Sequence, residues 1–98
     1  MSTAGPRFLV RFPHKAAPER TRGVGFLVAE RRVLTCAHVV NLALGRHRHT
    51  QDRPTEQDLV YLEFPLADGV ICRARVERWV PPPASGIRGG DIAGLVIV

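Results

Sequence analysis

A histidine that directly follows a short apolar segment is the first candidate for chemistry in this chain. The segment Val33–Cys36 leads into Ala37 and then His38. Thr35 and Ala37 are small and leave room for other groups to approach the imidazole, while the end of a strand fixes its position. A general base needs such support, because its ring must hold one orientation toward a proton donor. Taken alone, His38 fits better as a histidine with satisfied hydrogen bonds at a strand end.

A carboxylate next to two glycines is the second candidate. Gly89 and Gly90 permit a tight backbone path, and Asp91 stands immediately before an apolar run. One interpretation is a turn aspartate that accepts hydrogen bonds from nearby backbone amides. The other is a partly buried carboxylate that orients the histidine and stabilises its protonated form. Taken alone, Asp91 fits the turn interpretation better.

Three motifs together change this balance. They are G-V-G-F-L-V at 23–28, L-T-C-A-H-V-V at 34–40 and G-D-I-A at 90–93. In this order, with about 50 residues between histidine and aspartate, they resemble the trypsin-like (chymotrypsin-fold) serine peptidases. The resemblance covers roughly Arg7 to Val98 and corresponds to the N-terminal six-stranded barrel of that two-barrel fold.

The resemblance implies that His38 is the general base of a His-Asp-Ser triad and that Asp91 orients it. The nucleophile is missing from these 98 residues, because no G-D-S-G-G segment occurs; Ser85 precedes Asp91 in a Pro/Gly loop. We therefore expect the truncated N-terminal half of a serine endopeptidase. It would act on a polypeptide substrate only with a C-terminal barrel from the same gene or a separate chain, and would be inactive alone.

Two departures from the family refine the resemblance. Val39 stands where secreted members place a disulfide cysteine, and no I-V-G-G activation sequence lies near the N-terminus. Both features are similar to bacterial trypsin-like domains. Two other functions stay open: a non-catalytic binding or regulatory barrel derived from a peptidase, and a basic barrel that binds nucleic acid.

The remaining candidate residues favour structural interpretations. Cys36 and Cys72 form no C-x-x-C pair, so we expect buried free thiols and predict neither a metal site nor a cofactor. His47 and His49 form an H-x-H pattern without an accompanying carboxylate cluster, which favours a solvated loop. Trp79 precedes three prolines, and we expect it to pack on the rim of the barrel rather than to dock a peptide.

Composition limits the function classes. Apolar residues make up 45 % of the chain, which argues against a disordered tail, and no apolar run approaches the 18 or so residues of a membrane span. The net charge of +5 comes from scattered arginines without interleaved aromatic residues, so nucleic-acid binding is not favoured. The N-terminus has no secretory signal pattern, which predicts a cytoplasmic protein.

The elements that must position His38 and Asp91 are short strands. Six apolar segments are separated by Pro, Gly and charged breakers: Arg7–Phe12, Gly23–Ala29, Val33–Cys36, Leu59–Phe64, Val70–Val80 and Asp91–Val98. In the fifth, we expect Val70, Cys72, Ala74 and Val76 to face inward. Only Val39–Leu44 has helical character, too short for a core helix, and Asn41–Asp58 should be a long polar surface loop. Residues 1–98 are thus predicted to form one all-β domain, a six-stranded antiparallel Greek-key barrel.

Overall fold

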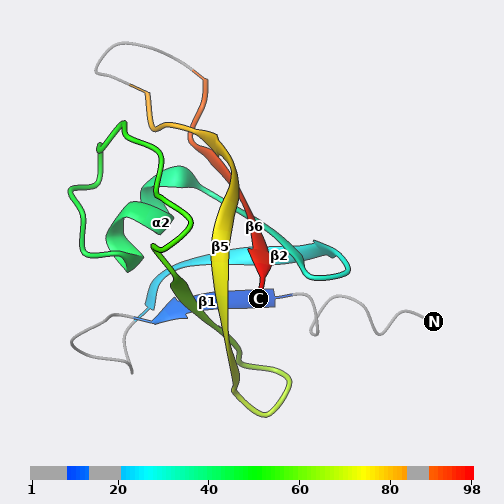
Figure 1. Cartoon of the computed structure of the whole chain (residues 1–98). Coiled ribbons are helices and arrows are strands. Elements are labelled where there is room, and N and C mark those ends of the chain that lie inside the picture. Colours follow the sequence, from blue (N-terminus) through cyan, green and yellow to red (C-terminus); the bar gives the residue numbers. More distant parts are fainter. Residues whose placement is uncertain (1–8, 14–20, 84–88) are drawn as a thin grey trace.

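Six antiparallel strands close into a barrel in the computed structural model, which describes residues 9–13, 21–83 and 89–98 (Figure 1). The order around the barrel is β1-β2-β3-β6-β5-β4. The elements are β1 (Leu9–Pro13), β2 (Thr21–Ala29), β3 (Arg32–Thr35), α2 (Ala37–Ala43), β4 (Val60–Phe64), β5 (Val70–Val80) and β6 (Ile92–Ile97). The predicted all-β class and the six-stranded antiparallel barrel are confirmed.

The inside of the barrel is filled by apolar side chains, which alternate along the strands with more exposed residues. On β5, Ala74 and Val76 point inward and are buried, as predicted. Val70 is an exception, because it pairs with Phe64 at the end of a hairpin and is 52 % exposed. The buried core consists of Val10, Phe12, Val33, Ala37, Val39, Val40, Val60, Leu62, Ala74, Val76, Ala93 and Leu95.

The barrel closes through a short seam between β1 and β4. Arg11 on β1 pairs with Glu63 on β4, and their side chains form an ion pair at 2.5 Å. Both side chains are 23 % exposed, so solvent screens this pair less than a fully exposed one. The charge pair joins the two strands that complete the ring.

Helix α2 takes part in the core, contrary to the expectation that a helix here would be too short for it. Ala37, Val39 and Val40 are buried from one side of α2 and pack against the barrel strands. The stretch expected as a loop begins inside this helix, and residues 44–59 contain neither helix nor strand. In the described part of the chain, no helix combines the length and apolar character that a membrane span requires.

Buried Asn41 holds the loop that follows α2. Its Nδ2 donates hydrogen bonds to the carbonyl oxygens of Arg48 at 2.9 Å and Thr50 at 3.0 Å. Trp79 adds a second connection by donating from Nε1 to the carbonyl of Gln51 at 2.9 Å while its ring packs against the core. The rim-packing interpretation of Trp79 therefore fits the structure.

Candidate active site

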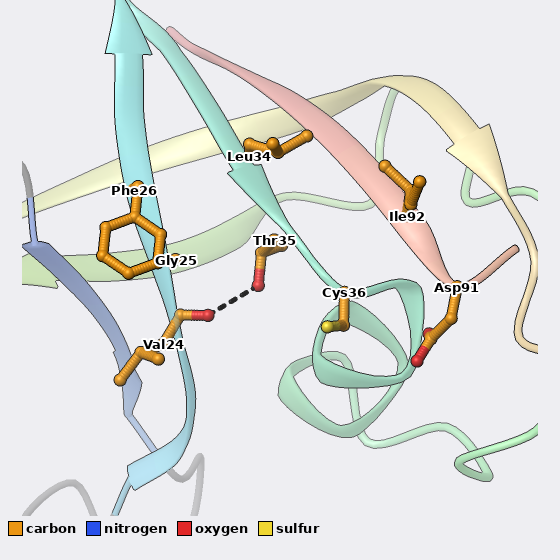
Figure 2. Close-up of a pocket in the computed structure, with 8 residues that line it drawn as sticks. All are labelled: Val24, Gly25, Phe26, Leu34, Thr35, Cys36, Asp91 and Ile92. Carbon is orange, nitrogen blue, oxygen red and sulfur yellow. Dashed lines mark hydrogen bonds between the residues drawn. The ribbon is translucent and has the colours of Figure 1, made fainter. Parts of the chain in front are cut away.

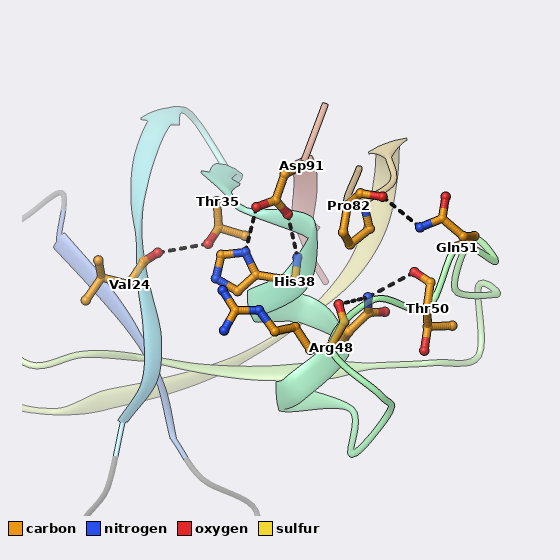
Figure 3. A network of polar contacts seen from close by, with 9 residues as sticks. Val24, Thr35, His38, Arg48, Thr50, Gln51, Pro82 and Asp91 are labelled. Atoms are coloured by element: carbon orange, nitrogen blue, oxygen red, sulfur yellow. Dashed lines mark hydrogen bonds and ion pairs between the residues drawn. The ribbon is translucent and has the colours of Figure 1, made fainter. Parts of the chain in front are cut away.

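The structure brings His38 and Asp91 together although they lie 53 residues apart in the sequence (Figure 3). His38 lies in the first turn of α2, directly after β3, and Asp91 immediately precedes β6. Strands β3 and β6 are neighbours, with Thr35 opposite Ala93. The two residues lie just beyond this shared edge, so strand pairing places them side by side.

Both carboxylate oxygens of Asp91 engage His38. Nδ1 lies 2.6 Å from Oδ2, and the His38 backbone N–H donates to Oδ1 at 2.8 Å. Because an ionised carboxylate only accepts hydrogen bonds, Nδ1 carries the proton in this contact, and Nε2 of a neutral ring is left as the proton acceptor. The side chains are 23 % and 26 % exposed, so the pair is partly shielded but reachable.

The backbone at Asp91 has an uncommon conformation. Its φ of 62° lies in the left-handed region, after positive φ values at Gly89 and Gly90. Aspartate tolerates this region better than most residues, and such strain of about 1–3 kcal/mol often persists at functional sites. The Asp91 N–H donates to the carbonyl of Pro81 at 2.9 Å, which helps to fix this turn. The carboxylate thus reaches His38 from a constrained backbone.

The end of β3 is held by close packing against β2. Thr35 is buried and its Oγ1 donates to the carbonyl of Val24 at 2.8 Å. A Cβ at Gly25 would come within 2.8 Å of the Leu34 carbonyl oxygen, so only glycine fits there without a backbone shift. This packing limits the movement of the strand that leads into His38.

Cys36 is the residue at this site whose part sequence reasoning missed. Its thiol, a His38 ring nitrogen and an Asp91 carboxylate oxygen all lie within 4.8 Å of one another. Cys36 and Cys72 are free thiols, but neither is buried as predicted; Cys36 is exposed and Cys72 is half-buried. Their buried state was inferred from residue type, but Cys36 just after β3 is exposed, and Cys72 packs against the core without being fully covered.

The thiol of Cys36 is held in its protonated form. Desolvation and then the negative charge of Asp91 raise the pKa of Cys36 above its ordinary value. A cysteine nucleophile needs the reverse, an environment that lowers the pKa and favours the thiolate. Cys36 is therefore poorly suited to replace serine as the nucleophile beside His38.

An open apolar hollow lies next to the His38–Asp91 pair. Cys36 and Asp91 line one side of it, and apolar side chains from β2, β3 and β6 line the rest (Figure 2). Phe26 is 54 % exposed, Leu34 45 % and Ile92 48 %, although all three are large and apolar. We call the exposed residues Val24, Phe26, Leu34 and Ile92 the outer apolar face.

His47 and His49 do not join this site. His47 and His49 lie in the exposed loop after α2, with ring centroids 5.7 Å apart. Among the described residues, the only three-residue group suited to holding a metal is Cys36, His38 and Asp91, so no third ligand accompanies His47 and His49. Ser85 lies outside the described residues.

Comparisons with protein-family models, curated proteins and solved structures returned no match to this chain. The resemblance to trypsin-like peptidases therefore stays a prediction from the sequence motifs. What the structure adds is the contact between the two residues that those motifs identify.

Proposed function

We propose that this chain is the N-terminal barrel of a trypsin-like serine endopeptidase. The observation that carries the proposal is the double contact of Asp91 with His38, at 2.6 Å to Nδ1 and 2.8 Å from the backbone N–H. A triad needs this arrangement, in which a carboxylate fixes the tautomer and orientation of the base. The Greek-key topology of the N-terminal half of a two-barrel fold belongs to the same proposal.

In this proposal His38 Nε2 accepts the proton of a serine hydroxyl as that oxygen attacks the peptide carbonyl. Asp91 then stabilises the imidazolium, and His38 returns the proton to the leaving amine. The serine and oxyanion hole come from a C-terminal barrel, in the same gene product or a separate chain. The free thiols Cys36 and Cys72 suit a reducing compartment, so we propose the cytoplasm as the location.

The test joins this barrel to its complement. The coding sequence downstream of Val98, and neighbouring genes, are searched for a G-x-S-G-G segment, and the encoded barrel is produced fused to or together with this chain. A fluorophosphonate probe should label the new serine, and His38→Ala should abolish labelling while His47→Ala leaves it unchanged. Labelling that His38→Ala does not reduce would show that His38 is not the base.

The outer apolar face favours a second candidate, a barrel that only binds another protein. Monomeric proteins seldom expose several large apolar side chains side by side, and such patches often mark interfaces. Phe26→Asp should weaken association with a partner barrel in either case, because Phe26 is 54 % exposed and its replacement spares the core. Association that depends on Phe26 without any fluorophosphonate labelling would support the binding module over the peptidase.

A further inference from the structure

The sulfur of Cys36 lies beside the His38–Asp91 pair, so the site holds three side chains that can bind a metal ion. Cys36 is the N-cap residue of α2, His38 lies two residues later, and Asp91 comes from the turn before β6. Their sulfur, nitrogen and oxygen donor atoms lie within 4.8 Å of one another. We propose that Cys36, His38 and Asp91 form a three-ligand site for a zinc ion.

The donor set determines the choice of metal. Thiolate and imidazole suit Zn²⁺, whereas Mg²⁺ and Ca²⁺ prefer oxygen donors throughout. Zinc bonds of about 2.0–2.3 Å in a tetrahedral arrangement place neighbouring donors about 3.3–3.6 Å apart. Donors that already lie within 4.8 Å reach this spacing by small side-chain rotations. Three protein ligands leave the fourth position to water, as in open zinc sites.

The backbone around the donors is already ordered. The Cys36 carbonyl accepts hydrogen bonds from Val39 at 3.1 Å and Val40 at 3.3 Å, and Asp91 is held by its bonds to His38 and Pro81. Little conformational entropy is therefore lost when the metal binds. On coordination the Cys36 thiol releases its proton to solvent, and His38 and Asp91 each donate a lone pair.

Zinc at this position would switch the proposed peptidase off, a consequence that rests on the proposed function. Coordination through Nε2 occupies the nitrogen that accepts the serine proton. Coordination through Nδ1 leaves the ring proton on Nε2, and the Asp91 carboxylate then binds the metal instead of His38 Nδ1. In both cases His38 cannot act as a base, so zinc binding and catalysis exclude each other.

Metal binding is measured on the full chain without any second barrel. Titration calorimetry with Zn²⁺ should show one ion per chain, and Co²⁺ should give thiolate-to-metal charge-transfer absorption. Loss of a partner that merely orients a ligand costs about 10–100-fold in metal affinity, so Cys36→Ser should weaken Zn²⁺ binding by at least about 100-fold and remove the Co²⁺ band. Asp91→Asn should also weaken binding, and circular dichroism checks that both variants remain folded.

Matched controls separate this site from the other candidate ligands. Cys72→Ser and the double variant His47→Ala/His49→Ala should bind Zn²⁺ like the parent chain. Equal affinity in Cys36→Ser and the parent, loss of binding in the His47/His49 variant, or no Zn²⁺ binding at all would each overturn the metal site.

The two proposals fail separately. In the joined two-barrel protein, Zn²⁺ should suppress fluorophosphonate labelling, and a chelator should restore it. Zinc binding by this chain without labelling of any joined protein would reject the peptidase and keep the metal site. Labelling that requires His38, together with no zinc binding, would reject the metal site alone.

Discussion

Two regions that carry histidines lie along the same stretch of chain, at the start of α2 and in the loop after it, and they differ in what holds them. His38 is bound by Asp91, which lies 53 residues away in sequence. The contacts of His47 are with residues close to it in sequence. The His49 backbone N–H donates to its Nδ1 at 3.1 Å, and the Thr50 hydroxyl donates to its carbonyl oxygen. Long-range pairing fixes the orientation of the His38 ring, whereas local contacts leave the loop histidines exposed to solvent.

The largest expected effect is on catalysis and tests whether the long-range contact matters. In the proposed two-barrel peptidase, Asp91→Asn should lower the rate of peptide hydrolysis by about 10⁴-fold, because the amide no longer selects the tautomer with Nδ1 protonated. Steady-state hydrolysis of a fluorogenic peptide measures this, with His49→Ala as a control that should change the rate by less than about twofold. A similar loss in both variants would contradict the distinction between the two regions.

The second prediction compares two glycines, Gly25 on β2 next to the His38 region and Gly45 in the loop after α2. Gly25→Ala should destabilise the chain by about 3 kcal/mol, because the new Cβ would lie 2.8 Å from the Leu34 carbonyl and 3.0 Å from Thr35 Cβ. Gly45→Ala in the loop meets no atom within 4 Å and is opposed only by its φ of 77°, which costs about 1 kcal/mol. Urea unfolding measures both. An equal cost would mean that β2 and β3 are packed no more tightly than the loop.

The third prediction releases the loop from the core. Asn41→Ala should lower the free energy of unfolding by about 1–3 kcal/mol, because the carbonyls of Arg48 and Thr50 lose their buried donor. Hydrogen exchange should then speed up at Thr50, whose N–H bonds to the His47 carbonyl, and stay unchanged at His38. Exchange that rises equally at His38 would show that the two regions are not independent.

The smallest expected effect lies at the far end of the loop. The Thr55 backbone N–H and then its hydroxyl hold the pKa of Asp58 below its ordinary value. A depressed folded-state pKa gives stability that is present above the unfolded pKa and lost as the pH falls through the folded value. From pH 6 to pH 3, the melting temperature in thermal unfolding should therefore fall slightly further in the parent chain than in Asp58→Asn. The same pH dependence of the melting temperature in both proteins would show that Asp58 does not contribute to stability in this way.

Much of the fold could be predicted from the periodicity of apolar residues and from the Pro, Gly and charged residues that separate the strands. The expected strand at Val70–Val80 coincides with β5, and Gly23–Ala29 lies within β2. The errors concern features that depend on distant partners. Val39 and Val40 pack into the core from α2, although a helix here was expected to be too short for that. Asn41 was assigned to a polar loop, although it is buried because its amide serves two loop carbonyls.

The sequence by itself identified His38 and Asp91 as a candidate pair and predicted the strands that carry them, because motif order and alternation are local properties of the chain. Only the tertiary structure decided that Asp91 contacts His38 through both oxygens and that Cys36 joins them within 4.8 Å. The physical reason is that pairing of β3 with β6 sets these distances, and no spacing along the chain encodes them.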